Sequence, residues 1–179
     1  MKRWSARRRR VYVAGCLALA LLVVAIAGVS RLFVWPALGT PAHADAIVMF
    51  DGVGARLSLA MRLANDQKAN VLVVSQGRDG YGGPCPASLK VRVICFDPNP
   101  SDTRGEAEFA AGLAKHYRWH SLILVTGHAQ ATRARLLMRR CFSGRIYVVA
   151  PRLKLSDLPM QLTYESVALA KALVLRRSC

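Results

Sequence analysis

The sequence predicts an α/β protein with a mainly parallel, doubly wound sheet of about five strands, preceded by one N-terminal transmembrane helix. From residue 45 onward, short runs rich in Val and Ile alternate with segments of helical periodicity. The short runs are apolar on both faces, which is typical of parallel strands covered by helices on both sides. Residues 11–30 carry no charge and are about as long as the roughly 20 residues that cross a bilayer.

The N-terminal segment predicts the orientation of the chain in the membrane. Four arginines, at positions 7–10, directly precede the apolar run, and the positive-inside rule places such a cluster in the cytoplasm. We therefore expect a single-pass protein of the plasma membrane, with its folded part outside the cytoplasm. Its parts are a basic cytoplasmic tail (1–10), a transmembrane helix (11–34), a linker (35–44) and an extracytoplasmic domain (45–179).

The alternative is a cleaved signal peptide, because Ala42, His43 and Ala44 fit a small-x-small cleavage site. That site lies well beyond the apolar run, and cleavage there would expose the first residue of a predicted strand.

The excess of basic residues favours anionic partners. The formal net charge is +16; the six cations before the apolar run account for six of these charges, which leaves +10. Phosphates or acidic lipid headgroups are expected partners of such a domain. Nucleic acid is not expected, because the basic domain lies on the wrong side of the membrane. A positively charged solvated surface is the alternative interpretation.

Five strands and four helices follow the linker. The strands are predicted at residues 45–50, 71–75, 91–96, 122–126 and 145–150, and the helices at 55–68, 104–118, 129–142 and 161–176. This alternation predicts right-handed crossovers and a Rossmann-like doubly wound fold. The connection between the second and third strands has no clear helix and is rich in glycine and proline, so we predict an ordered surface loop there, with a possible role as a lid.

The cysteines agree with an oxidising compartment. Cys16 lies inside the membrane span, and the other four lie outside. Their spacing matches no zinc signature, so no metal site is expected.

Strand direction predicts how these four pair. Cys95 lies at the carboxyl end of its strand, and Cys85 lies in the loop that leaves the carboxyl end of the preceding strand. Cys141 ends a helix that runs to the opposite edge of the sheet, and Cys179 follows a final helix predicted to run the same way. We expect the disulfides Cys85–Cys95 and Cys141–Cys179.

Ligands of open α/β sheets bind at the carboxyl ends of the strands, where helix N-termini attract anions. Polar and flexible residues follow four of the predicted strands at this edge. As ligand-binding candidates we take Asp51, Gly52, Gly54, Arg56, Ser75, Gly77, Thr103, Thr126, Gly127, Gln130 and Arg133. As catalytic candidates we take His128, Glu106 and Ser75.

Each of these features has a structural alternative. The glycines after the first strand suit a tight turn. Thr103 and Glu106 fit a capping box, in which the threonine hydroxyl accepts from a backbone amide and the glutamate reaches back. His128 is suited either to general acid or base chemistry or to a structural hydrogen bond. Three further arginines (Arg135, Arg139 and Arg140) are expected to be solvated or to lie favourably near a helix C-terminus.

Four motifs occur in an order that resembles the YdcF-like family, which includes SanA- and ElyC-type envelope proteins: "ADAIVMF…G…ARLSLAMRLA", "VLVVSQG", "SDTRGEAEFA" and "LILVTGHAQATRARLL". The resemblance spans nearly the whole domain from about residue 44. It implies a membrane-anchored Rossmann-like domain linked to cell-envelope or peptidoglycan precursor metabolism. The positions that match are Gly52, Arg56, Ser75, Gly77, Thr103, Glu106, Thr126 and Arg133.

The chain departs from the family pattern at two places. Asp51 stands where the first strand of the family usually ends in glycine. The family histidine lies four residues after a threonine, where this chain has Gln130, while His128 lies two residues earlier. Glutamine can form hydrogen bonds but cannot transfer protons near neutral pH.

Two functional classes follow. One is an envelope protein that binds or processes a phosphorylated cell-wall precursor, free or lipid-linked, with Arg56 and Arg133 on the phosphate. The other is a non-catalytic, membrane-tethered interaction protein that uses a basic face on anionic lipids or envelope partners. The first requires arginines that converge on one cleft, and the second spreads them over the surface. The residues indicate no particular cofactor and no particular reaction.

Overall fold

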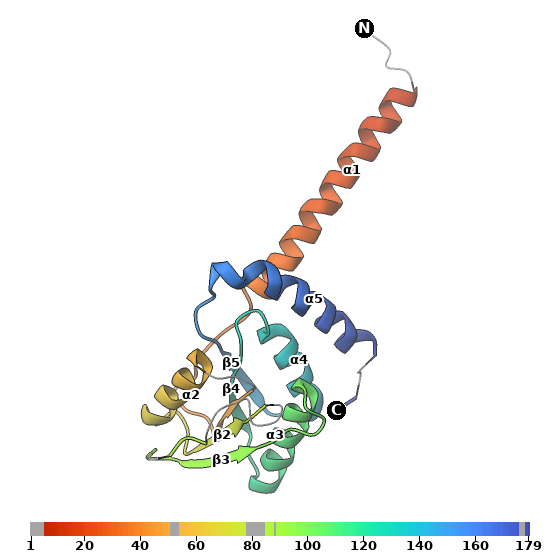
Figure 1. The fold of residues 1–179 in the computed structure, drawn as a ribbon. Helices are drawn as coiled ribbons and strands as arrows, with labels where there is room; N and C mark the ends of the chain where they lie inside the picture. The colour runs from red at the N-terminus through yellow and green to blue at the C-terminus, as the bar shows by residue number, and fades with distance from the viewer. Residues whose placement is uncertain (1–5, 51–53, 78–84, 88, 176–177) are drawn as a thin grey trace.

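The computed structural model describes residues 6–50, 54–77, 85–87, 89–175 and 178–179. Its N-terminal helix α1 (Ala6–Val29) continues into a π-helical turn (Ser30–Val34) and extends away from a folded domain (Figure 1). The stretch Arg8–Val34 is long and apolar enough to cross a membrane, and the window that qualifies it has no buried residue. The predicted apolar N-terminal helix is therefore present.

The domain is built on one five-stranded parallel sheet. Its strands are β1 (Ala46–Met49), β2 (Val71–Ser75), β3 (Arg92–Phe96), β4 (Ser121–Val125) and β5 (Arg145–Val149). The predicted strands are confirmed to within one residue at every end. The strand order is β3-β2-β1-β4-β5, with all neighbours parallel. The chain direction across the sheet therefore reverses between β1 and β4, and such a switch point is where ligands of these folds bind.

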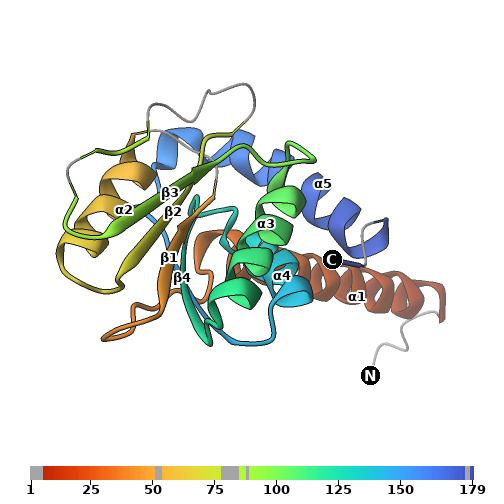
Figure 2. The ribbon, with the colours of Figure 1, turned by 90° about the horizontal axis from the view of Figure 1, so that it is seen from below.

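Helices cover both faces of this sheet. The helix α2 (Ala55–Asn65) lies on one face, whereas α3 (Thr103–Tyr117) and α4 (Ala131–Cys141) lie on the other (Figure 2). The step from β1 to β2 and the step from β3 to β4 run in opposite directions along the sheet, so crossovers of one hand must place their helices on opposite faces. The last helix, α5 (Leu158–Val174), begins three residues earlier than predicted.

The core follows the two-residue period of the strands. In β1, Val48 belongs to the cluster beneath α3 and α4, whereas Ile47 and Met49 belong to the cluster beneath α2. Successive side chains of a strand point to opposite faces, so one apolar run fills both layers. The described part of the β2–β3 connection contains no helix; there Leu89 and Val91 pack against the α2 cluster. The central part of the loop, residues 78–84, lies outside the described residues, so the predicted lid is not addressed.

Both predicted disulfides are confirmed. Cys85 pairs with Cys95, and Cys141 pairs with Cys179, with Cα–Cα distances of 5.9 and 4.9 Å. The second bond joins the end of α4 to the last residue of the chain. Because the two cysteines are 38 residues apart, this bond closes β5 and α5 into one loop that starts at the end of α4.

The end of the apolar helix is seated on the domain. Phe33 is buried in a small cluster with Ala129 and Leu169, and the Thr132 hydroxyl donates to the Leu32 carbonyl at 2.6 Å. These contacts hold the turn Ser30–Val34 against the start of α4 and the inner side of α5.

Two arginines of α4 are more than solvated charge. The Arg135 guanidinium donates to the carbonyl of Ala37 in the linker, and Arg140 donates to the carbonyl of Ala172 in α5 at 2.9 Å. The expectation of a solvated role is wrong for these two side chains, because both hold neighbouring segments on the helix. Arg139 is exposed, as expected.

Candidate functional site

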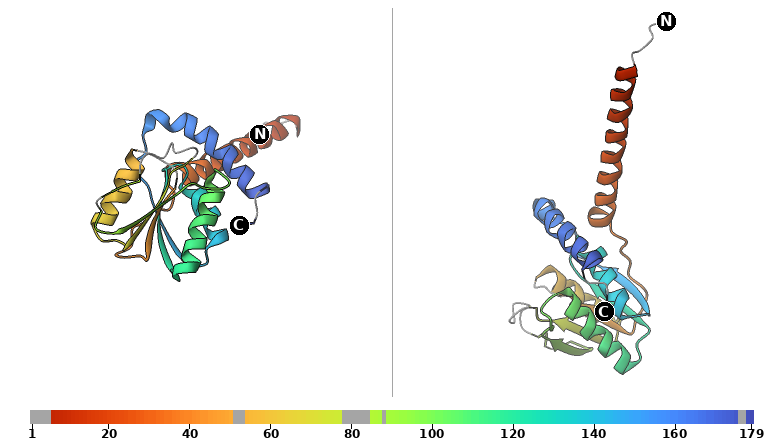
Figure 3. Two further views of the ribbon diagram at one scale, coloured as in Figure 1. Left: turned by 60° about the horizontal axis from the view of Figure 1, so that its bottom comes forward. Right: turned by 90° about the vertical axis from the view of Figure 1, so that its right-hand side faces the viewer.

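A cleft of about 780 Å³ lies at the carboxyl edge of the sheet. Its walls come from the loops that follow the strands, from the first turns of α2, α3 and α4, and from the first half of α5. Figure 3 shows α5 running across the end of the sheet from which these loops emerge. The structure thus places a cavity at the edge where the sequence predicted one.

Most of the sequence-predicted site residues meet in this cleft. The predicted residues among its lining are Gly54, Arg56, Gly77, Thr103, Glu106, Gly127, His128, Gln130 and Arg133. Ser75 and Thr126 do not line the cleft and are completely buried. The Ser75 hydroxyl accepts from the Gly77 amide at 3.4 Å, a local contact that suits a turn. Asp51 and Gly52 lie outside the described residues.

A chain of polar contacts links three elements across the floor of the cleft. Arg56 of α2 donates to the side-chain oxygen of Gln130 at 3.3 Å. The Gln130 amide donates in turn to the Thr103 hydroxyl at 3.1 Å, which also accepts from Arg133 at 2.9 Å. Gln130, at the position where the family pattern has histidine, is therefore the central link between the start of α3 and the start of α2.

Arg133 forms a buried, two-pronged ion pair with Glu165 of α5. The guanidinium Nε and one Nη donate to the two carboxylate oxygens at 2.7 and 2.9 Å, and the side chains are only 10% and 7% exposed. Burial alone would lower the pKa of Arg133, but the hydrogen bonds and charge of Glu165 outweigh it and raise that pKa. Arg133 lines the cleft as predicted, yet its charge is already balanced by a protein carboxylate.

The expected capping box at Thr103 is wrong by one residue. The N-cap of α3 is Asp102, whose carboxylate accepts from the amides of Arg104 and Gly105 at 2.9 and 3.2 Å. The Thr103 hydroxyl faces the side chains of α4 instead. Glu106 is 1% exposed and is one of the negative charges that raise the pKa of Arg133.

The first turns of α2 and α4 line the cleft, and no described side chain caps either helix. Gly54 is the N-cap of α2, with φ of 68°, a conformation in which glycine carries no steric penalty. Because glycine has no side chain, it cannot cap the helix. Gln130 is the N-cap of α4, and its side chain binds Arg56 and Thr103 rather than the helix amides. Amides at helix N-termini of this kind attract anions.

His128 connects the cleft to the turn Ser30–Val34 at the end of the apolar helix. Its Nε2 lies 3.1 Å from the Val34 carbonyl, and because a carbonyl only accepts, Nε2 carries the proton. In a neutral ring this leaves Nδ1 as the acceptor, and that atom is buried without a hydrogen-bond partner among the described residues. The structural alternative for His128 is therefore realised at one nitrogen, while the other is buried and has no hydrogen-bond partner among the described residues.

The fifth strand supplies cleft residues that the sequence reasoning missed. Arg152 and Lys154 follow β5, and Asp157, Tyr164 and Glu165 come from the start of α5 and the turn before it. Polar residues gather after the carboxyl ends of the strands. The same signal after the fifth strand would have identified Arg152 and Lys154. No comparable local signal points to Glu165, because its role depends on α5 folding back over the cleft.

The position of each charge decides the electrostatics of the cleft, because the lining holds equal numbers of cations and acids. Asp102 caps a helix and Glu165 binds Arg133, so these two carboxylates act on protein groups. Arg152 and Lys154 are exposed, and Arg56 is half-buried. Glu106 is 1% exposed, so Asp157 is the carboxylate of the lining that remains beside these three cations, and the surface open to a ligand is predominantly cationic.

Comparison with known proteins identifies no family for this chain. No family model matches the chain, and no curated protein matches it either. One solved structure is matched, glycinamide ribonucleotide transformylase 1 from Symbiobacterium toebii, with 17% identity and a TM-score of 0.38 over 69% of this chain. The match spans 61% of that structure, and a similarity this low supports no conclusion.

Among the described residues, no group of three or more His, Cys, Asp and Glu side chains could hold a metal ion.

Proposed function

We propose that this chain is a membrane-anchored envelope protein whose cleft binds the phosphate of a phosphorylated cell-wall precursor, either free or lipid-linked. The observation that carries the proposal is the convergence of Arg56, Arg152 and Lys154 with the N-termini of α2 and α4 on one cleft of about 780 Å³. Side-chain cations and the N-terminal ends of helices are the two groups that proteins commonly use for phosphate. A diffuse basic surface would lack this convergence.

The size and place of the cleft support an amphiphilic or sugar-bearing ligand. Pockets for small molecules are commonly about 300 to 1,000 Å³, so the cleft holds more than a bare phosphate. One wall is formed by Met160 and Tyr164 of α5, and α5 lies beside the end of α1 (Figure 1). A lipid-linked phosphate could therefore enter without leaving the membrane surface.

The envelope assignment has separate support. Two disulfides tie the domain together, and disulfides persist mainly outside the reducing cytoplasm. The arginine run before α1 favours a cytoplasmic N-terminus in the plasma membrane. The cell-wall precursor as ligand class follows from the resemblance to the YdcF-like family.

A chemical step, if the protein catalyses one, would use the titratable groups of the cleft. Glu106 and His128 line it, and Nδ1 of His128 would serve as a base only if a ligand reaches this buried atom. Ser75 is completely buried beneath the cleft, which makes it the weakest of the three catalytic candidates. The proposal is therefore one of ligand binding, with proton transfer assigned to no single residue.

The test is ligand binding by the full chain in detergent micelles, measured as thermal stabilisation with a polyprenyl phosphate, a sugar nucleotide and inorganic phosphate. A ligand that binds only the folded state raises the melting temperature. We expect Arg56→Ala and Arg152→Ala each to weaken binding of the phosphorylated ligand about 10- to 100-fold, since hydrogen bonds to charged groups contribute about 1.5–3 kcal/mol.

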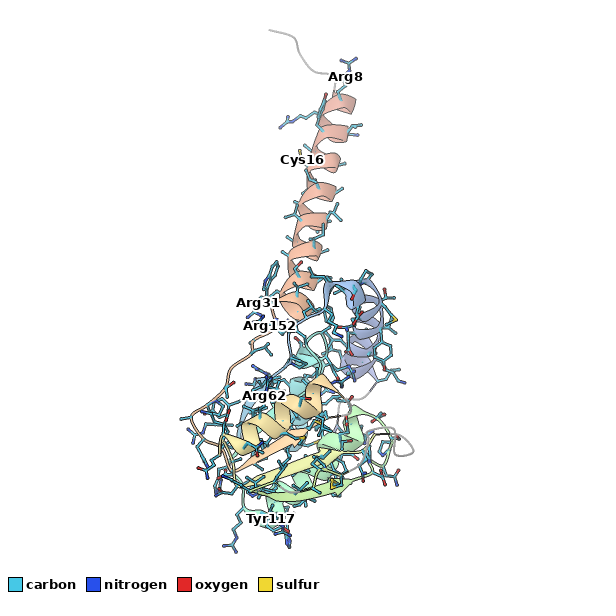
Figure 4. All side chains as sticks on the ribbon, turned by 60° about the vertical axis from the view of Figure 1, so that its left-hand side comes forward. Arg8, Cys16, Arg31, Arg62, Tyr117 and Arg152 are labelled. Carbon is cyan, nitrogen blue, oxygen red and sulfur yellow. A yellow bond between two sulfur atoms is a disulfide. The ribbon has the colours of Figure 1, made fainter. Side chains whose placement is uncertain are left out.

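The matched control is Arg62→Ala, because Arg62 is exposed in the last turn of α2, at the other end of that helix from Arg56 (Figure 4). It should bind like the parent protein. Equal losses in all three variants would point to the alternative function, a tethered interaction protein with a diffuse basic face. Arg133→Ala is unsuitable, because it would leave the buried Glu165 without its cation.

A further inference from the structure

The outer side of α5 is an exposed apolar stripe. Met160, Tyr164, Val167 and Val174 are 73%, 65%, 67% and 63% exposed, and their spacing places them on one side of the helix. Leu155, in the turn before α5, is 75% exposed. Together these five side chains form what we call the α5 stripe. Contiguous apolar surfaces of this kind are rare on monomeric soluble proteins and mark an interaction site.

The charge of α5 selects among possible partners. The only acidic residue within Leu158–Val174 is Glu165, and it is buried in its pair with Arg133. The exposed side of the helix therefore carries Lys171 but no carboxylate. Lys171 lies in line with the α5 stripe, between Val167 and Val174, and Asp157 lies in the turn before the helix. An exposed apolar helix side that carries a cation and no carboxylate is suited to the surface of an anionic membrane.

The position of α5 fits such a surface. The helix runs crosswise to α1 at the level where α1 meets the domain (Figures 1 and 3). Its inner side contributes Leu162 and Leu169 to the cluster around Phe33, so it is held against the end of the apolar span. A helix crosswise to a spanning helix lies roughly parallel to the bilayer plane.

A second feature lies beside the same end of α1. A pocket of about 410 Å³ between the membrane-proximal segment and α4 is lined by Arg31, Arg135 and Arg139, with no acidic residue in its lining. We call it the arginine pocket. Burial and the nearby charge of Arg139 lower the pKa of Arg135, and an anion between these arginines would relieve that repulsion.

We propose that the domain docks on the bilayer that α1 crosses, with the α5 stripe inserted at the boundary of headgroups and acyl chains. In this arrangement the arginine pocket receives lipid phosphates of the same leaflet. Because α1 already holds the domain at the membrane, docking costs little additional translational freedom. The inference depends on α1 spanning the membrane and not on what the cleft binds.

Docking would also set the direction from which the cleft is reached. Tyr164 belongs to the α5 stripe and also lines the cleft, next to Glu165. In the docked arrangement, α5 forms the wall between the leaflet and the cleft.

The experiment uses the full chain reconstituted into vesicles of phosphatidylcholine with phosphatidylglycerol. A dansyl amino acid replaces Val167 in one protein and Tyr117 in another, because Tyr117 lies at the far end of the domain from α1 (Figure 4). Lipids with a spin label on the acyl chain then quench any dansyl group that enters the leaflet. We expect several-fold stronger quenching at position 167 than at position 117.

Two other outcomes at position 167 would overturn the proposal. Emission typical of water, with no quenching, would mean that the stripe faces solvent. Emission shifted to the blue without quenching by lipid would mean that a second copy of the chain covers it. Circular dichroism and intact disulfides establish that each labelled protein is folded.

The arginine pocket is tested with the double variant Arg135→Gln, Arg139→Gln carrying the label at position 167. Quenching should fall in vesicles that contain phosphatidylglycerol and stay unchanged in pure phosphatidylcholine. No change in either membrane would overturn the phosphate role of the pocket. The cleft variant Arg56→Ala should leave quenching unchanged, so failure of docking and failure of ligand binding can be told apart.

Discussion

The two edges of the sheet differ in where the hydrogen-bond partners of their charged residues come from. At the amino edge, the Asp45 carboxylate accepts from the His120 amide, the Ser121 amide and the Ser121 hydroxyl at 2.7, 2.8 and 2.9 Å. These donors belong to the start of the strand beside β1, so strand pairing itself brings them together. At the carboxyl edge, the partner of Arg133 comes from α5, which folds back across the cleft.

The difference separates two uses of polar side chains. The Asp45 contacts tie β1 to β4 and lie away from the cleft, so their role is stability. The contacts of Arg133, Thr103 and Gln130 hold three helices around a cleft, so they contribute both to stability and to the shape of a binding site. Variants at the two edges should therefore differ in size of effect and in what else they change.

The largest effect is expected at the carboxyl edge, for Glu165→Gln. The substitution keeps the side-chain shape but leaves Arg133 buried without its anion, which should lower the free energy of unfolding by about 3–5 kcal/mol. Chemical denaturation in detergent measures this loss. Adding Arg133→Met should recover much of it, and strictly additive losses in the double variant would show that the two residues act separately.

The next largest losses of stability are expected on removing the disulfides, which differ in the length of the loop that they close. Removing Cys141–Cys179 by paired serine substitutions should cost about 4 kcal/mol, and removing Cys85–Cys95 about 1 kcal/mol less. The reason is that the two bonds span 38 and 10 residues, and closing a longer loop removes more entropy from the unfolded chain. Thermal unfolding of the two variants gives the order, and a larger loss for the shorter loop would contradict the argument.

At the amino edge, Asp45→Asn should cost about 1–2 kcal/mol at neutral pH, because charge-assisted hydrogen bonds are replaced by neutral ones. Burial opposes ionisation of Asp45, but the hydrogen bonds from His120 and Ser121 outweigh it and hold its pKa below the usual value.

The pH dependence follows from that direction. A depressed carboxyl pKa contributes stability that is fully present above the unfolded value of about 3.9 and is lost as pH falls through the folded value. Denaturation curves of parent and variant should therefore differ at neutral pH and converge in acid. The control is Asp66→Asn, at the exposed C-cap of α2. If the difference in stability between the parent and Asp45→Asn persists in strong acid, the Asp45 carboxylate does not cause it.

The smallest effect is expected for an Arg–Glu ion pair on the surface. Arg104 and Glu108 form an i, i+4 pair at 2.7 Å with side chains 33% and 30% exposed. Because water screens such a pair, Glu108→Gln should change the free energy of unfolding by only about 0.3–0.5 kcal/mol. Together with Glu165→Gln, it shows whether burial or the pairing of Arg with Glu sets the cost; equal losses would rule out burial.

Much of the architecture follows from local patterns in the sequence. Runs such as "VLVVS" are apolar at every position, and only strands covered on both faces need that. The uncharged stretch behind the arginine run identifies the apolar helix by length alone. Strand direction then determines which loops share an edge, and this placed nine of the candidate residues at one cleft and paired the four cysteines correctly.

The tertiary structure decided which partner each polar group takes. Asp102 rather than Thr103 caps α3, and this one-residue shift releases the Thr103 hydroxyl to Arg133. Glu165 neutralises Arg133 only because α5 folds back over the carboxyl edge, 32 residues along the chain. Periodicity reports which face of an element is apolar, because burial acts on each element separately. A hydrogen bond between distant segments depends on positions that no local pattern encodes, and the tertiary fold alone brings those atoms within 3 Å.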